Sequence, residues 1–124
     1  MTAQRLVPPI FVWETGDLTC FATVADAQIS LEAIDVKDGA YIAFDAEGRR
    51  LRLSTQVERT GGFLFPNSPI ERVVIDCAED TPSGQGALSD ILRSFLQSVG
   101  EDSTRLRSLS LAELEERARL RAAR

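Results

Sequence analysis

The spacing of apolar residues predicts two amphipathic helices in this chain. Residues 24–33 carry apolar side chains at helical spacing after Thr23, and Asp26 follows three positions on, as in a capping box with aspartate in place of glutamate. Residues 88–99 fill a longer helical pattern with Leu88, Ile91, Leu92, Phe95, Leu96 and Val99. Gly100 stands where glycine commonly follows a helix. Both helices are expected to cover a sheet with their apolar faces.

Alternation of apolar and polar residues predicts two hairpins. The first joins residues 10–14 to residues 18–22 through the turn-like Thr15-Gly16-Asp17 stretch. The second joins residues 41–45 to residues 50–55 through Ala46-Glu47-Gly48, where glycine is free to take a positive φ. Between the first hairpin and the second, after the helix at 24–33, residues 35–39 are expected to form a loop.

The remaining middle of the chain reads as one strand between two loops. Residues 58–69 are rich in Gly, Pro and Asn, and the Phe63-Leu64-Phe65 run inside them fits either a short edge strand or a loop over the core. Residues 72–77 contain the β-branched run Val73, Val74 and Ile75, typical of a strand covered on both faces. Residues 79–86 are then expected to be an acidic, flexible loop.

The C-terminal segment differs from the rest. Ser110-Leu111-Ala112-Glu113 is a good capping box, and Glu113/Arg117 and Glu115/Arg119 are spaced for i,i+4 ion pairs. Its apolar stripe is thin, with only Leu111, Leu114 and Ala118, and isolated helices of this length are marginal. We expect a helix that lies loosely on the body or one that a neighbouring chain stabilises.

These elements predict an α+β fold. Residues 1–100 would form a single domain, an antiparallel sheet of four to six strands with the helices 24–33 and 88–99 packed on it, and residues 101–124 a charged helical tail. A chain of 124 residues with 44% hydrophobic residues can bury enough surface without a metal or a disulfide framework.

The two cysteines and the N-terminus indicate a cytoplasmic protein. Cys20 and Cys77 each lie in an apolar strand-like run, which favours two buried thiols in a reducing compartment, although a Cys20–Cys77 bridge stays open if their strands are neighbours. The N-terminal run is broken by Pro8-Pro9 and is no secretory signal, and no window is apolar enough to span a membrane.

The charge of the chain disfavours nucleic acid as a partner. The net charge is −5, and residues 1–100 hold 14 acidic and 8 basic residues while residues 101–124 hold 5 and 6. An acidic body repels phosphate backbones and favours encounter with a basic protein, although mild acidity also serves solubility alone. Arg49, Arg50 and Arg52, without interleaved aromatic residues, indicate a solvated strand face.

Residue types needed for most catalytic sites are missing. The chain has no histidine, the commonest general base and metal ligand, and no GxxxxGK[ST] or GxGxxG motif. Gly84-Gln85-Gly86 superficially resembles a phosphate-binding loop, but it lacks a lysine and follows Glu79 and Asp80, so a flexible lead-in to the helix is favoured. The sequence therefore predicts no catalytic residue, no cofactor and no metal.

Acidic pairs at the predicted turns allow two interpretations. Asp35 with Asp38, and Asp45 with Glu47, fit the chemistry of turns, and they also fit an exposed patch that binds a partner. Acid–base catalysis would require one carboxylate of a pair to be desolvated, and nothing in the local sequence indicates burial. Trp13 is expected in the core; if it were exposed, it would be the best candidate for an interface anchor.

The run SLEAIDVKDGAYIAFDAEGRRLRL resembles a group of small bacterial proteins in which a helix ending in L-E-x-I-D-V leads into a G-x-Y-x-x-[FY]-D-x-E-G-R hairpin. The preceding TGDLTCFATVADA fits the same group, so the likeness covers residues 9–55. Many members resemble immunity proteins of polymorphic toxin systems. The resemblance implies a protein that binds one cognate toxin and blocks its active site.

A non-catalytic toxin inhibitor is accordingly the function expected here, with a cognate protein toxin as partner and neither nucleic acid nor membrane. Steering by acidic loops would speed capture of a basic toxin. The residues expected to contact it are Asp35, Asp38, Asp45, Glu47, Glu79 and Asp80. Two alternatives stay open: a structural or regulatory adaptor that self-associates through the tail, and a small enzyme that uses carboxylates alone.

Overall fold

A computed structural model describes residues 6–60, 68–77 and 84–122 of the chain. Within these ranges the fold is α+β, as predicted, with two antiparallel sheets and five helices. The strands are β1 (Ile10–Glu14), β2 (Asp17–Phe21), β3 (Ile42–Phe44), β4 (Leu51–Thr60) and β5 (Ser68–Cys77). The helices are α1 (Val24–Ser30), α2 (Ala33–Lys37), α3 (Gln85–Ser98), α4 (Ser103–Arg107) and α5 (Leu111–Ala122).

The first sheet has three strands in the order β2-β1-β3. Its hairpin β1–β2 confirms the predicted one, and Thr15 and Gly16 form its tight turn with φ values of 47° and 87°. Two consecutive positive φ values are typical of the two-residue turn of a hairpin, because the twist of that turn matches the twist of the two strands that it joins. The turn therefore sets Glu14 directly opposite Asp17.

The second sheet contains only β4 and β5, so the prediction of one sheet of four to six strands is wrong. The predicted pairing of residues 41–45 with residues 50–55 is also wrong, because β3 pairs with β1 and β4 pairs with β5 along its whole length. A single bridge, Phe44 to Arg50, joins the two sheets. Alternation of apolar and polar residues identified each strand. It does not show which two strands pair, because a strand can pair with any strand that offers a free edge.

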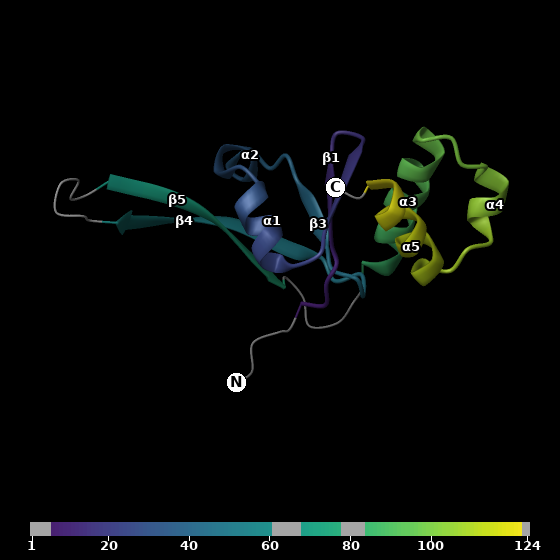
Figure 1. Cartoon of the computed structure of the whole chain (residues 1–124), viewed down its shortest axis with the longest axis horizontal. Helices are drawn as coiled ribbons and strands as arrows, with labels where there is room; N and C mark the ends of the chain where they lie inside the picture. Colours follow the sequence, from purple (N-terminus) through teal and green to yellow (C-terminus); the bar gives the residue numbers. More distant parts are fainter. Residues whose placement is uncertain (1–5, 61–67, 78–83, 123–124) are drawn as a thin grey trace.

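The long β4–β5 hairpin projects from the body at one end of the molecule (Figure 1). It occupies both ends of the predicted connection at 58–69, since β4 continues to Thr60 and β5 begins at Ser68. The Phe63-Leu64-Phe65 run lies outside the described residues.

The predicted helix at 24–33 is two short helices. Thr23 caps α1 as expected, since its Oγ1 accepts the backbone N–H of Asp26 at 3.0 Å. The helix ends at Leu31, whose backbone is extended at ψ 145° and whose side chain is buried. The chain then turns into α2, so residues 35–37 are helical and not the expected loop.

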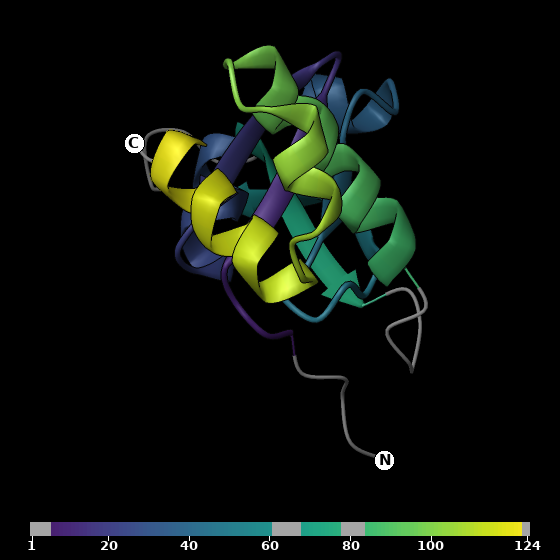
Figure 2. The ribbon, with the colours of Figure 1, turned by 90° about the vertical axis from the view of Figure 1, so that its right-hand side faces the viewer.

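The three-stranded sheet is the middle layer between two cores. Helices α3, α4 and α5 cover one face, where Phe11, Leu18 and Phe44 meet the helical side chains. On the other face Ile10 and Val12 pack with α1, α2 and the second sheet. Figures 1 and 2 show this order, with α5 crossing in front of the strands in Figure 2. Burial of both faces follows from the consecutive apolar run of β1, which lacks a polar side.

The tail packs more closely than expected. Leu114 and Ala118 on α5 are fully buried against α3 and the sheet. The capping box is confirmed, because the Ser110 N–H donates to Glu113 Oε1 at 2.9 Å and the Glu113 N–H donates to Ser110 Oγ at 3.2 Å. The thin stripe suffices because the small Ala118 lets α5 lie close to its neighbours, so a loose helix is not what forms.

The predicted i,i+4 ion pairs of the tail are replaced by others. Arg117 binds Glu101 at 3.1 Å, and Arg121 binds the same carboxylate. Arg119 binds Glu116 at 2.6 Å. Glu101 follows the positive-φ Gly100 that ends α3, so these bonds tie the two ends of the helical layer together.

Candidate functional site

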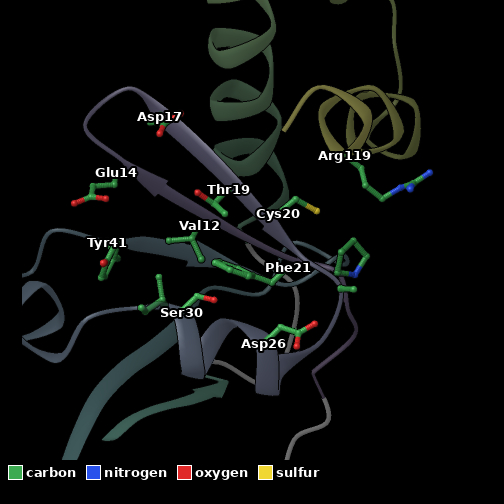
Figure 3. A pocket seen from close by; sticks show the side chains of 13 residues that line it. Val12, Glu14, Asp17, Thr19, Cys20, Phe21, Asp26, Ser30, Tyr41 and Arg119 are labelled. Carbon is green, nitrogen blue, oxygen red and sulfur yellow. The ribbon is translucent and has the colours of Figure 1, made fainter. Parts of the chain in front are cut away.

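An open groove of about 710 Å³ lies beside β2, and we call it the β2 groove (Figure 3). Val12, Phe21, Leu31 and Tyr41 form its apolar floor. Its polar lining contains Glu14, Asp17, Thr19, Asp26, Ser30 and Arg119. Strands β1 and β2, helix α1 and helix α5 therefore all contribute to one surface.

The tight hairpin places two carboxylates on this surface. Glu14 and Asp17 face each other across the Thr15-Gly16 turn, and opposed residues of an antiparallel pair share one face of the sheet. That face is also the one on which Val12 and Thr19 lie. Asp26 comes from the first turn of α1, where its backbone is bonded to Thr23. The groove thus collects three carboxylates from three elements, β1, β2 and α1.

The groove is acidic overall. Among the described residues that line it, Arg119 is the one cation, against Glu14, Asp17 and Asp26. The Arg119 guanidinium is bonded to Glu116, and this hydrogen bond raises its pKa above the ordinary value. Because Glu116 already neutralises Arg119, the field in the groove favours a cationic ligand.

Cys20 lines the groove but is not set up as a nucleophile. It is a free thiol, so the Cys20–Cys77 bridge that the sequence left open does not form. Burial raises its pKa to about 11, with Arg119 opposing the shift and Glu115 adding to it. The thiolate is the reactive form, so the Cys20 thiol stays protonated and unreactive near neutral pH.

Asp45 is the main correction to the predicted site. Its side chain is 0% exposed, although the turn interpretation placed it at an exposed tip. Oδ1 accepts the backbone N–H groups of Glu47 and Arg49, and Oδ2 accepts the Val7 N–H and Arg49 Nη1. These bonds use up the carboxylate inside the fold, so it does not face a partner.

A second acidic group lies near Asp45. Oε2 of Glu115, on α5, is buried and makes no hydrogen bond within the described part of the chain. Burial, together with the negative charge of Asp45, raises the Glu115 pKa to about 7. Because this pKa lies near neutral pH, the charge of Glu115 changes with pH in the folded protein.

The other predicted contact residues are scattered. Asp35 lies in α2, where its carboxylate accepts the Tyr41 hydroxyl at 3.3 Å, and Asp38 is exposed at the end of that helix. Glu47 is exposed and ion-paired with Arg49. Glu79 and Asp80 lie outside the described residues. Among the predicted contact residues that the structure describes, none lines the groove, and Asp35 is linked to it through its bond to Tyr41.

Sequence reasoning missed Glu14, Asp17 and Asp26 as site residues. The sequence places Asp17 in a turn and Asp26 in a helix cap; the cap is confirmed, but Asp17 is the first residue of β2, opposite Glu14. A signal existed, since a two-residue turn puts its flanking residues on one sheet face. That α1 and α5 would frame this face could not be read from the sequence.

The phosphate-loop alternative at Gly84-Gln85-Gly86 has no room for a ligand. The Gly84 N–H donates to the Gly48 carbonyl at 3.0 Å, and Gln85 Nε2 donates to the Glu47 carbonyl at 3.0 Å. The turn that contains Glu47 and Gly48 therefore covers the start of α3. Trp13, the other open position, is partly buried and packs against the helical core. Among the described residues no three acidic, cysteine or histidine side chains are grouped to hold a metal.

Comparison with known proteins identifies no relative: no family model, no curated protein and no solved structure matches the chain. Across residues 6–60, 68–77 and 84–122, none of the helices has the length and apolar character to cross a membrane.

Proposed function

We propose that this protein acts by binding another protein, and that it is an immunity protein which neutralises a cognate bacterial toxin through the β2 groove. The observation that carries the proposal is the acidic β2 groove itself, with Glu14, Asp17 and Asp26 around an apolar floor. An apolar floor with a charged rim is the usual composition of a protein interface.

The lining chemistry supports recognition over reaction. The Cys20 thiol has a pKa of about 11, which removes the most reactive nucleophile of the groove near neutral pH. The carboxylates Glu14, Asp17 and Asp26 form the rim, where charges increase the association rate with an oppositely charged partner. The toxin would therefore present a basic surface that includes its catalytic residues.

The toxin identity can be tested genetically and biochemically. A candidate toxin domain, taken from a gene adjacent to this one, is expressed with and without the protein. We expect restored growth and a one-to-one complex on size-exclusion chromatography. Toxicity that persists despite soluble expression of both proteins would contradict the proposal.

Charge reversal separates the β2 groove from the predicted loop patch. One variant carries Glu14→Lys, Asp17→Lys and Asp26→Lys, and a control variant carries Glu32→Lys and Asp38→Lys at the exposed positions that cap the two ends of α2. We expect the groove variant to lose affinity for the toxin by about 100-fold or more and the α2 variant to stay within about threefold of the wild type. A larger loss of toxin affinity in the α2 variant than in the groove variant would place the interface at α2.

The adaptor alternative requires a tail surface that is free to self-associate. Leu114, Ala118 and Ala122 are buried within their own chain, so the apolar stripe of α5 is already occupied. Leu120 is the large apolar side chain that α5 leaves exposed. One exposed leucine offers too little area for a stable dimer, which supports toxin binding over the adaptor function.

A further inference from the structure

We infer that the partner inserts an extended, basic segment that adds to the three-stranded sheet as a strand beside β2. This inference rests on the proposed protein-binding function and specifies its mode of recognition. Strand addition uses backbone hydrogen bonds for affinity and alternate side chains for specificity. Three features of the described residues lead to it: a strand edge, a groove along that edge and the charge of the groove.

The strand edge is that of β2. In the described part of the chain the sheet order is β2-β1-β3, so one side of β2 has no paired strand. The Thr15-Gly16 turn makes Glu14 and Asp17 a hydrogen-bonded pair, and bonded pairs alternate along an antiparallel ladder. Thr19 and Phe21 therefore bond toward β1. The N–H and C=O groups of Leu18 and Cys20 point to the outer edge.

The register of β1 fits this assignment. Phe11, Val12 and Trp13 lie opposite Phe44, Ala43 and Ile42 of β3, on the other side of β1 from β2. A residue of a central strand directs its backbone groups to one neighbour only, so a bonded pair Val12–Thr19 leaves Phe11 and Trp13 to bond toward β3. Leu18 and Cys20, which lie opposite Trp13 and Phe11, are then without a bond to β1.

The groove provides the space for an added strand. Neighbouring strands lie about 4.8 Å apart, and the open volume beside Thr19, Cys20 and Phe21 is on that side of β2. Figure 3 shows Arg119 from α5 above this edge and Asp26 from α1 below it. The two helices would flank the incoming strand and keep it in the plane of the sheet.

The charge of the groove selects the side chains of the segment. An added strand has every second side chain on the face of Thr19 and Phe21, which is also the face of Glu14 and Asp17. Asp26 lies on the same side, from α1. Lysine or arginine at alternate positions would meet these three carboxylates. The intervening positions would face α5, where the ion pair of Arg119 with Glu116 offers no net charge to recognise.

The first test uses a capped synthetic peptide of about seven residues in which lysine alternates with threonine and valine. A matched peptide carries N-methyl groups on the amides that would bond to β2, so its charge is unchanged. We expect the N-methylated peptide to bind the full-length protein at least about tenfold more weakly. Equal binding of the two peptides, or no binding of either at millimolar concentration, would overturn strand addition.

The second test removes one of the outward-facing N–H groups from β2 of the protein. Cys20→Pro removes the outward N–H and keeps the bonds of Thr19 and Phe21 to β1, and proline is tolerated on edge strands at such positions. Cys20→Ser is the matched control that keeps the N–H. We expect the proline variant to lose peptide and toxin affinity by about tenfold and the serine variant to retain both. Circular dichroism establishes that both variants are folded.

Amide exchange in the wild-type protein gives a readout independent of any substitution. The amides of Leu18 and Cys20 are expected to become protected when the peptide binds, whereas those of Thr19 and Phe21 are already bonded. Binding without protection of Leu18 and Cys20 would disprove strand addition. If the groove charge reversals still abolished toxin binding in that case, the proposed function would stand while this mode of recognition failed.

Discussion

Oδ2 of Asp45 accepts a hydrogen bond from the backbone N–H of Val7 at 3.1 Å, and Val7 in turn accepts one through its carbonyl from the Ala46 N–H at 2.8 Å. This reciprocal contact attaches the segment before β1 to the turn after β3. The same carboxylate holds the turn itself through the N–H groups of Glu47 and Arg49. One buried side chain therefore fixes both where the chain enters the sheet and where it leaves for the second sheet.

Asp45→Asn is expected to destabilise the protein by about 2–4 kcal/mol, because the amide nitrogen cannot accept the N–H groups that one oxygen now holds in a buried site. Urea unfolding followed by circular dichroism measures the change. Asp38→Asn is the control: Asp38 is exposed at the end of α2, and its substitution should change stability by less than about 0.5 kcal/mol. Equal effects of the two substitutions would contradict the structural role of Asp45.

Gly48→Ala is expected to destabilise by about 2 kcal/mol or more, because Gly48 has φ +86° and an added Cβ would lie 2.5 Å from Gln85 Cγ and 2.8 Å from Gln85 Cα. Gly86→Ala is the matched control. No atom lies within 4 Å of its added Cβ, and alanine is the better helix former, so stability should rise by about 0.5 kcal/mol. Thermal unfolding of both variants checks the opposite signs.

Leu114→Ala is expected to cost about 2–5 kcal/mol, because Leu114 is fully buried under α5. Leu120→Ala on the same helix is the control, since Leu120 is 64% exposed and its truncation should stay within about 0.5 kcal/mol of the wild type. Denaturant midpoints give both values. A dimer that the Leu120 substitution dissolved would favour the adaptor function instead.

Glu115 is expected to make the protein less stable as pH rises. Its folded pKa is about 7, above the ordinary 4.5, so the folded state holds the proton more tightly than the unfolded state between these values. The free energy of unfolding should therefore fall from about pH 5 to about pH 7 and change little above. Because the side chain is only half-buried, solvent screening limits the effect to about 1 kcal/mol.

Glu115→Gln should remove this pH dependence, so that the variant exceeds the wild type in stability at about pH 8 and equals it at about pH 5. Urea unfolding across this range measures it. Glu116→Gln, at an exposed neighbouring position, should keep the slope of the wild type. An unchanged slope in the Glu115 variant would assign the pH dependence to other groups.

Local physical chemistry explains which elements the sequence predicted well. The cap at Thr23, the capping box at Ser110 and the positive φ of Gly48 and Gly100 each depend on a few neighbouring residues. The long apolar face of α3 needed no partner to be recognised. Each of these features can be read from residues within one or two turns of chain.

The partners of those elements were decided only by the tertiary structure. The strand at 42–44 pairs with β1 and not with β4. Asp45 is buried and accepts hydrogen bonds from the neighbouring Arg49 and from Val7, which lies 38 residues earlier in the chain. The β2 groove exists because α1 and α5 reach the same strand from opposite ends of the chain. Many arrangements of the same elements satisfy the alternation and capping signals. The choice of strand partners depends instead on which distant segments share the core, and so do the burial of the Asp45 carboxylate and the shape of the groove.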